Sequence, residues 1–82
     1  MSDITVKKEE IPILSYLYRF GGWRSLEQIS NRVPGPDLMP CLQRLIEVGM
    51  VIPDGQRERY MITDAGGKLM KGLEESGIPL PY

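Results

Sequence analysis

The sequence contains no histidine and has one cysteine, Cys41, among its 82 residues. A single cysteine excludes an intramolecular disulfide, and without histidine one chain cannot build a zinc site from histidine and cysteine ligands. The commonest general base is missing for the same reason, and the chain has neither a G-x-x-x-x-G-K nor a G-x-G-x-x-G phosphate-binding loop. We therefore expect no metal, no cofactor and no enzymatic activity.

Long apolar runs and a surplus of positive charge are also lacking. No stretch approaches the ~20 apolar residues that span a membrane, and residues 1–10, MSDITVKKEE, lack the apolar region of a secretory signal. Ten Lys and Arg residues stand against eleven Asp and Glu, so the net charge is −1. We expect a cytoplasmic protein with no membrane partner. Any contact with nucleic acid must come from a local basic patch.

The composition that remains indicates one small globular domain. Apolar residues make up 41% of the chain and charged residues 26%, which is ordinary for a soluble domain. Residues 1–8 are mostly polar and predict a loose N-terminal arm, and residues 9–77 should form the folded domain. Residues 78–82 form a tail whose two prolines exclude a helix.

Two helices and a short extended stretch are predicted in the first part of the domain. The first helix should begin near residues 9–12, with Pro12 in its first turn, and end at Gly21-Gly22. Residues 23–24 then read as a short strand. The motif S-L-E-Q at 25–28 is a capping box that starts a second helix, which breaks at Pro34-Gly35.

A third helix, over about residues 36–48, is predicted from leucines at helical spacing, with Gly35 or Asp37 as its cap and Gly49 after its end. A hairpin, over about residues 50–62, should follow. Its strands would cover 50–52 and 57–62, joined by a turn at 53–56.

Thr63 is the expected N-cap of a fourth helix, which should end near residues 76–77 and pack beside the first helix. Ala65, Leu69 and Leu73 mark its predicted buried stripe. The glycine pair inside this helix, Gly66-Gly67, predicts a close approach to a neighbouring element.

Two stretches of this pattern resemble a known superfamily. Residues 38–51, LMPCLQRLIEVGMV, resemble the recognition helix and exit of winged helix–turn–helix regulators. Residues 59–66, RYMITDAG, resemble their Y-x-[IL]-T-x-x-G signature. Both occur in the MarR-like and PadR-like regulators of bacteria and archaea, and the resemblance covers about residues 11–75. Typical MarR-like proteins are longer, with long dimerisation helices at both ends.

The resemblance implies an α+β, mainly α, fold: a three-helix core, a small β-hairpin wing and a C-terminal helix. It also implies a dimeric transcription regulator that places the third helix in the major groove of double-stranded DNA and the wing on the backbone or minor groove. Winged helices also serve as protein-interaction modules or as subunits of larger complexes, so that alternative stays open.

Candidate DNA contacts lie on the outward face of the third helix, at Met39, Pro40, Gln43 and Arg44. Gln43 is suited to adenine, and Arg44 to guanine or a phosphate. Glu47 on the same face opposes DNA by like charge, and the competing interpretation is a solvated helix surface.

The wing offers a second candidate contact. Arg57 and Arg59 should share one strand face, and with Arg24 on the neighbouring strand they could clamp phosphate groups. The competing interpretation is charge at the sheet edge that prevents edge-to-edge pairing. Residues 19–62 carry six basic and five acidic side chains, and every basic one is arginine.

Three further residues or groups invite interpretation. Trp23 is predicted to lie in the core or against the second helix, with an exposed anchor for a protein partner as the alternative. Cys41 lies on the apolar stripe of the third helix and should be a buried, inert thiol. The aromatic surplus of the first helix, together with the apolar tail at 78–82, favours a homodimer.

Overall fold

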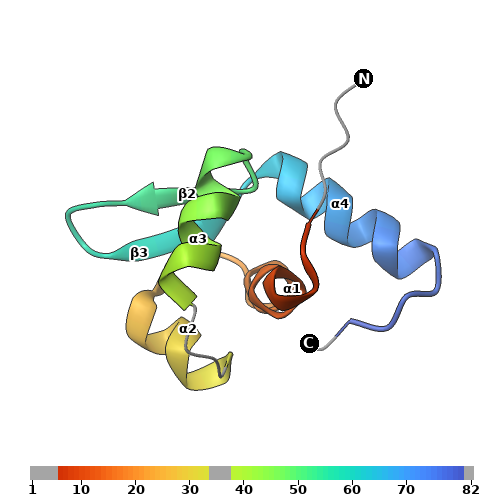
Figure 1. The fold of residues 1–82 in the computed structure, drawn as a ribbon, viewed down its shortest axis with the longest axis horizontal. Coiled ribbons are helices and arrows are strands. Elements are labelled where there is room, and N and C mark those ends of the chain that lie inside the picture. Colours follow the sequence, from red (N-terminus) through yellow and green to blue (C-terminus); the bar gives the residue numbers. More distant parts are fainter. Residues whose placement is uncertain (1–5, 34–37, 81–82) are drawn as a thin grey trace.

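The computed structural model describes residues 6–33 and 38–80 of the chain. Its elements follow the predicted order, preceded by one short 3-10 turn, η1 (Figure 1). They are η1 (Lys8–Glu10), α1 (Ile11–Phe20), β1 (Arg24–Ser25), α2 (Leu26–Arg32), α3 (Leu38–Glu47), β2 (Val51–Asp54), β3 (Arg59–Ile62) and α4 (Asp64–Glu75). The break at 34–35 and the cap of the third helix, predicted at Gly35 or Asp37, lie outside the described residues.

The predicted helix starts at Ser25 and Thr63 are confirmed. The backbone N–H of Gln28 donates to Ser25 Oγ (3.1 Å), and the N–H of Ser25 donates to Gln28 Oε1 (2.9 Å). Thr63 Oγ1 accepts from the N–H of Gly66 at 3.1 Å and donates to the carbonyl of Gly49 at 2.6 Å. Each cap satisfies backbone donors that the first turn of a helix leaves unpaired.

The core lies between α1, α3 and the start of the hairpin, and the last helix covers it from the other side. Its fully buried side chains include Leu14 and Leu17 of α1, Leu42 and Leu45 of α3, and Met70 of α4. As predicted, α4 packs beside α1. The core therefore fixes α3 by two leucines on one face and leaves the opposite face available.

The buried stripe of α4 differs from the prediction. Ala65 is exposed, Leu69 and Leu73 are half-buried, and the fully buried positions are Gly66 and Met70. A Cβ at Gly66 would lie 2.6 Å from the carbonyl oxygen of Met50 and 2.7 Å from Cγ1 of Ile62. The close approach predicted for the glycine pair thus occurs at Gly66. The face of α4 that carries Gly66 is turned toward the hairpin, and Ala65 is left on the exposed side.

The three strands form an antiparallel sheet in the order β1-β3-β2. Directly opposed residues point to the same face, so Val51 and Ile62 face the core while Ile52 and Met61 lie on the outer face. The predicted turn at 53–56 was wrong, because β2 continues through Asp54, which pairs with Arg59. Pro53 is tolerated since β2 is an edge strand, where a missing N–H costs no ladder bond.

The hairpin turn therefore occupies residues 55–58, and Glu58 adopts a positive φ of 50°. Arg57, predicted to begin the returning strand, lies in this turn instead. Within the described residues, no helix combines the length and the apolar character needed to cross a membrane.

Candidate functional site

The outward face of α3 carries the predicted exposed side chains. Met39, Pro40, Gln43 and Glu47 are exposed, and Met39 retains 41% of its accessible surface. Cys41 is half-buried rather than fully buried, because it lies at the border between this face and the core. The helix thus presents two apolar residues, an amide and a carboxylate to solvent.

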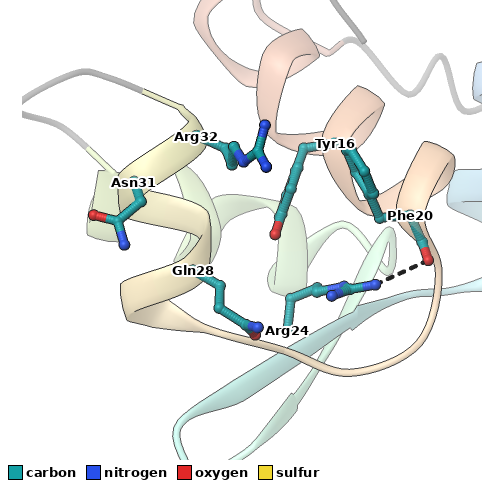
Figure 2. A pocket seen from close by; sticks show the side chains of 6 residues that line it. All are labelled: Tyr16, Phe20, Arg24, Gln28, Asn31 and Arg32. Atoms are coloured by element: carbon teal, nitrogen blue, oxygen red, sulfur yellow. Dashed lines mark hydrogen bonds between the residues drawn. The ribbon is translucent and has the colours of Figure 1, made fainter.

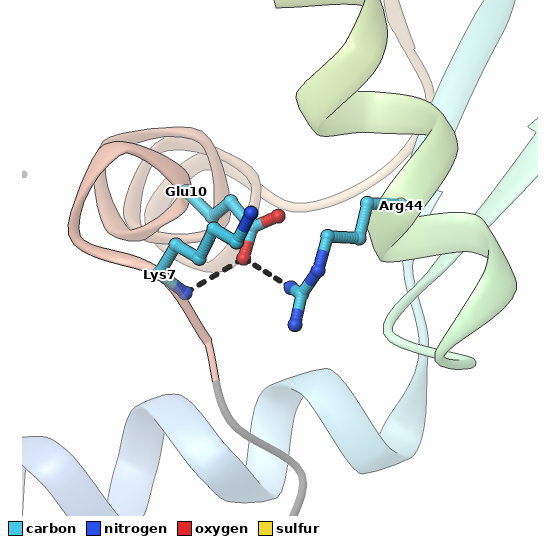
Figure 3. Close-up of polar contacts among 3 residues, drawn as sticks. All are labelled: Lys7, Glu10 and Arg44. Carbon is cyan, nitrogen blue, oxygen red and sulfur yellow. Dashed lines mark hydrogen bonds and ion pairs between the residues drawn. The ribbon is translucent and has the colours of Figure 1, made fainter.

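Arg44, the fourth residue predicted for this face, is turned toward the N-terminal turn instead. Its Nη1 lies 2.6 Å from Oε1 of Glu10, and the backbone N–H of Lys7 donates to the same oxygen at 2.7 Å (Figure 3). The Glu10 side chain is only 1% exposed. Sequence reasoning could not find this pair, because the two residues are 34 positions apart and no motif links them.

The wing arginines have different surroundings. Arg57 is exposed in the hairpin turn, whereas Nη2 of Arg59 donates to Oδ2 of Asp54 at 2.9 Å. The hydrogen bond from Arg59 holds the pKa of Asp54 below its ordinary value of 3.8. The guanidinium carbon of Arg59 also lies 5.5 Å from the centre of the Trp23 ring, within cation–π distance.

Arg24 does not join the other two arginines in one clamp. Arg24 is paired with Tyr60, and Arg59 with Ser25, so Arg24 and Arg59 point to opposite faces of the sheet. Arg24 instead donates from Nε to the carbonyl of Gly21 and from Nη2 to that of Phe20, both at 3.1 Å. The prediction that Arg24, Arg57 and Arg59 together form one phosphate clamp is therefore wrong.

Trp23 is not a core residue, contrary to the prediction. It is 37% exposed and lies against Arg59 on the outer face of the sheet. The prediction failed because it took a lone tryptophan as core, whereas the alternation along the chain into β1 directs Trp23 outward. The alternative prediction, an exposed anchor for a partner, remains open.

A pocket that sequence analysis did not anticipate lies between α1, β1 and α2 (Figure 2). Its volume is about 400 Å³, and the described residues that line it are Tyr16, Phe20, Arg24, Gln28, Asn31 and Arg32. No local motif joins these residues, which come together only when α2 folds back on the end of α1. Across the described parts of the chain, no group of three or more His, Cys, Asp or Glu residues could hold a metal ion.

The arrangement of these elements is similar to that of a solved structure, ligand-free NadR. The two superpose with a TM-score of 0.76 and are 24% identical, over 85% of this chain and 52% of NadR. This chain has a winged-helix-like fold. We refer to the β2–β3 hairpin as the wing. No protein-family model and no curated protein matches the sequence.

Proposed function

We propose that this protein is a DNA-binding transcription regulator that contacts double-stranded DNA through α3 and the wing. One observation carries the proposal: α3 is anchored by buried leucines on one side and presents Met39, Pro40 and Gln43 to solvent on the other. The wing projects beyond the helices on the side away from α4 (Figure 1). A winged helix with this exposure can insert its third helix in the major groove while the wing reaches the backbone.

The side chains suit separate roles on DNA. The Gln43 amide can pair with the N6 and N7 edge of adenine, and Met39 can contact a thymine methyl group. Arg57, exposed at the wing tip, is suited to a phosphate. Arg44 and Arg59 are held by carboxylates in the free protein, so they would bind phosphate only in exchange for those ion pairs.

The DNA-bound form is proposed to be a homodimer. Ile78 is 44% exposed, which leaves apolar surface in the segment after α4. Two copies would place two third helices in successive major grooves, about 34 Å apart.

The test is fluorescence anisotropy of a labelled duplex at several salt concentrations. Affinity should fall steeply with salt, and Arg57→Ala should reduce the slope of log K against log salt by about one. Lys71→Ala is the matched control, because Lys71 is an exposed cation on α4, away from the wing. Absence of binding at low salt and high protein concentration would reject the DNA-binding proposal.

A protein-interaction module is the second candidate, and the outer face of the sheet favours it. Trp23 and Ile52 retain 37% and 42% of their surface there, beside the half-buried Met61. Tryptophan is enriched among residues that dominate protein interfaces. A photo-crosslinking amino acid at position 52 should capture a protein partner in cells if this candidate is correct. Binding to that partner should resist salt and be lost in Trp23→Ala.

A further inference from the structure

We propose that the pocket between α1, β1 and α2 is a binding site for a small phosphate monoester. The site is separate from the surface proposed to contact DNA, because none of its described lining residues belongs to α3 or to the wing. Its volume of about 400 Å³ falls within the range of roughly 300–1,000 Å³ that small-molecule sites occupy.

Two arginines give the pocket its charge. Arg24 from β1 and Arg32 from α2 both reach toward α1, and each guanidinium carbon lies 5.8 Å from the centre of the Phe20 ring (Figure 2). The described lining contains no carboxylate. Two positive groups that line one concave space attract an anion and concentrate it there.

Arg24 is held in position before any ligand arrives. Its Nε and Nη2 donate to the carbonyls of Gly21 and Phe20, at the C-terminal end of α1. These two bonds use two of the five N–H groups of a guanidinium, and they fix its plane. Arg24 forms no ion pair within the described parts of the chain, so its remaining donors can serve an anion.

The charge and the remaining lining select the class of anion. A phosphate monoester carries about −1.5 to −2 charges at pH 7 and offers three acceptor oxygens, which match two guanidiniums better than a single carboxylate does. The exposed ring of Phe20, 5.0 Å from that of Tyr16, offers a surface for an apolar or flat part of the ligand. The amides of Gln28 and Asn31 can bond its hydroxyl groups.

The experiment is an NMR titration of the ¹⁵N-labelled protein with phenyl phosphate at pH 7 and low salt. Saturable shifts are expected at the side-chain amides of Gln28 and Asn31 and at Nε–H of Arg24. Arg24→Gln and Arg32→Gln should each weaken binding about tenfold or more, because each removes a charge-assisted hydrogen bond. Lys71→Gln, at an exposed cation on α4 that lies outside both the pocket and the proposed DNA surface, should bind like the wild type.

Three results would overturn the proposal. A titration in which the shifts grow linearly without saturation, or in which Lys71→Gln weakens binding equally, would show only general attraction of anions. Benzoate binding as tightly as phenyl phosphate would refute the phosphate class. Displacement of phenyl phosphate by a short duplex, with Arg32→Gln lowering DNA affinity as much as Arg57→Ala, would assign the pocket to the DNA backbone. If Arg24→Gln does not fold, Arg32→Gln on the exposed side of α2 decides the outcome.

Discussion

Glu10 of the 3-10 turn and Arg44 of α3 form an ion pair of 2.6 Å across 34 positions of sequence. The carboxylate is almost entirely buried, while the guanidinium is 32% exposed. The backbone N–H of Lys7 donates a hydrogen bond to the same carboxylate oxygen. The pair therefore ties the segment before α1 directly to the helix that we propose reads DNA.

Arg44→Ala should destabilise the fold, because it leaves the carboxylate of Glu10 buried without its cation. Since Arg44 is partly exposed to water, we expect a loss of about 1–3 kcal/mol rather than the larger value of a fully buried pair. Urea unfolding followed by circular dichroism measures the loss. Arg57→Ala, an exposed arginine without this pairing, is the control and should change stability by less than about 0.5 kcal/mol. Equal losses in the two variants would contradict a structural role for the pair.

Gly66→Ala and Gly72→Ala should change stability in opposite directions, although both lie in α4. A methyl group at Gly66 would overlap the Met50 carbonyl and the Ile62 side chain, so we expect a loss of about 1–3 kcal/mol. Gly72 has open space around its Cβ position, and alanine there should stabilise the helix by about 0.5–1 kcal/mol. Thermal unfolding of both variants measures this. If Gly66→Ala were as stable as the wild type, the close approach of α4 to the hairpin would be contradicted.

Local signals predicted the elements well because their chemistry is local. The capping box at Ser25 and the N-cap at Thr63 depend on residues three positions away, so the sequence contains the whole motif. Pro53 was wrongly predicted to begin a turn. A proline is tolerated in β2 because β2 is an edge strand, and its place at the edge is known only once the sheet has assembled.

The candidate site was less predictable, because Arg44 pairs with a residue that is far away in the sequence. Helical spacing correctly predicted that Gln43 is exposed. It could not show that Arg44, expected on the same face, is turned toward Glu10. The face on which a strand residue lies can be predicted only when the start of the strand is known. Because the turn was predicted two residues too early, Arg57 was wrongly assigned to a strand. Arg32 of the pocket reaches the Phe20 ring because α2 folds back on α1, and no spacing in the sequence encodes that approach.

The pKa of Asp54 should rise in Arg59→Gln, toward the ordinary value of 3.8, because the hydrogen bond from Arg59 is the largest of the interactions that lower it. A carboxylate with a lowered pKa stabilises the folded state above its unfolded pKa, and this contribution is lost as the pH falls through the folded value. The wing should therefore loosen on acidification below about pH 4. A ¹³C titration of the Asp54 carboxyl group in both proteins measures the shift, and identical titration curves would contradict the pairing.

Glu10→Gln should increase DNA affinity if the proposed function is correct, because it removes the charge that competes with phosphate for Arg44. A neutral amide can still accept a hydrogen bond, so the fold should survive while the hold on the guanidinium weakens. One additional phosphate contact should raise the slope of log K against log salt by about 0.9 and strengthen binding most at low salt. Anisotropy titrations of Glu10→Gln, and of Glu10→Gln combined with Arg44→Gln, separate the two effects. A gain that persists in the double variant cannot come from Arg44, and would mean that the loss of the negative charge at position 10 is by itself sufficient.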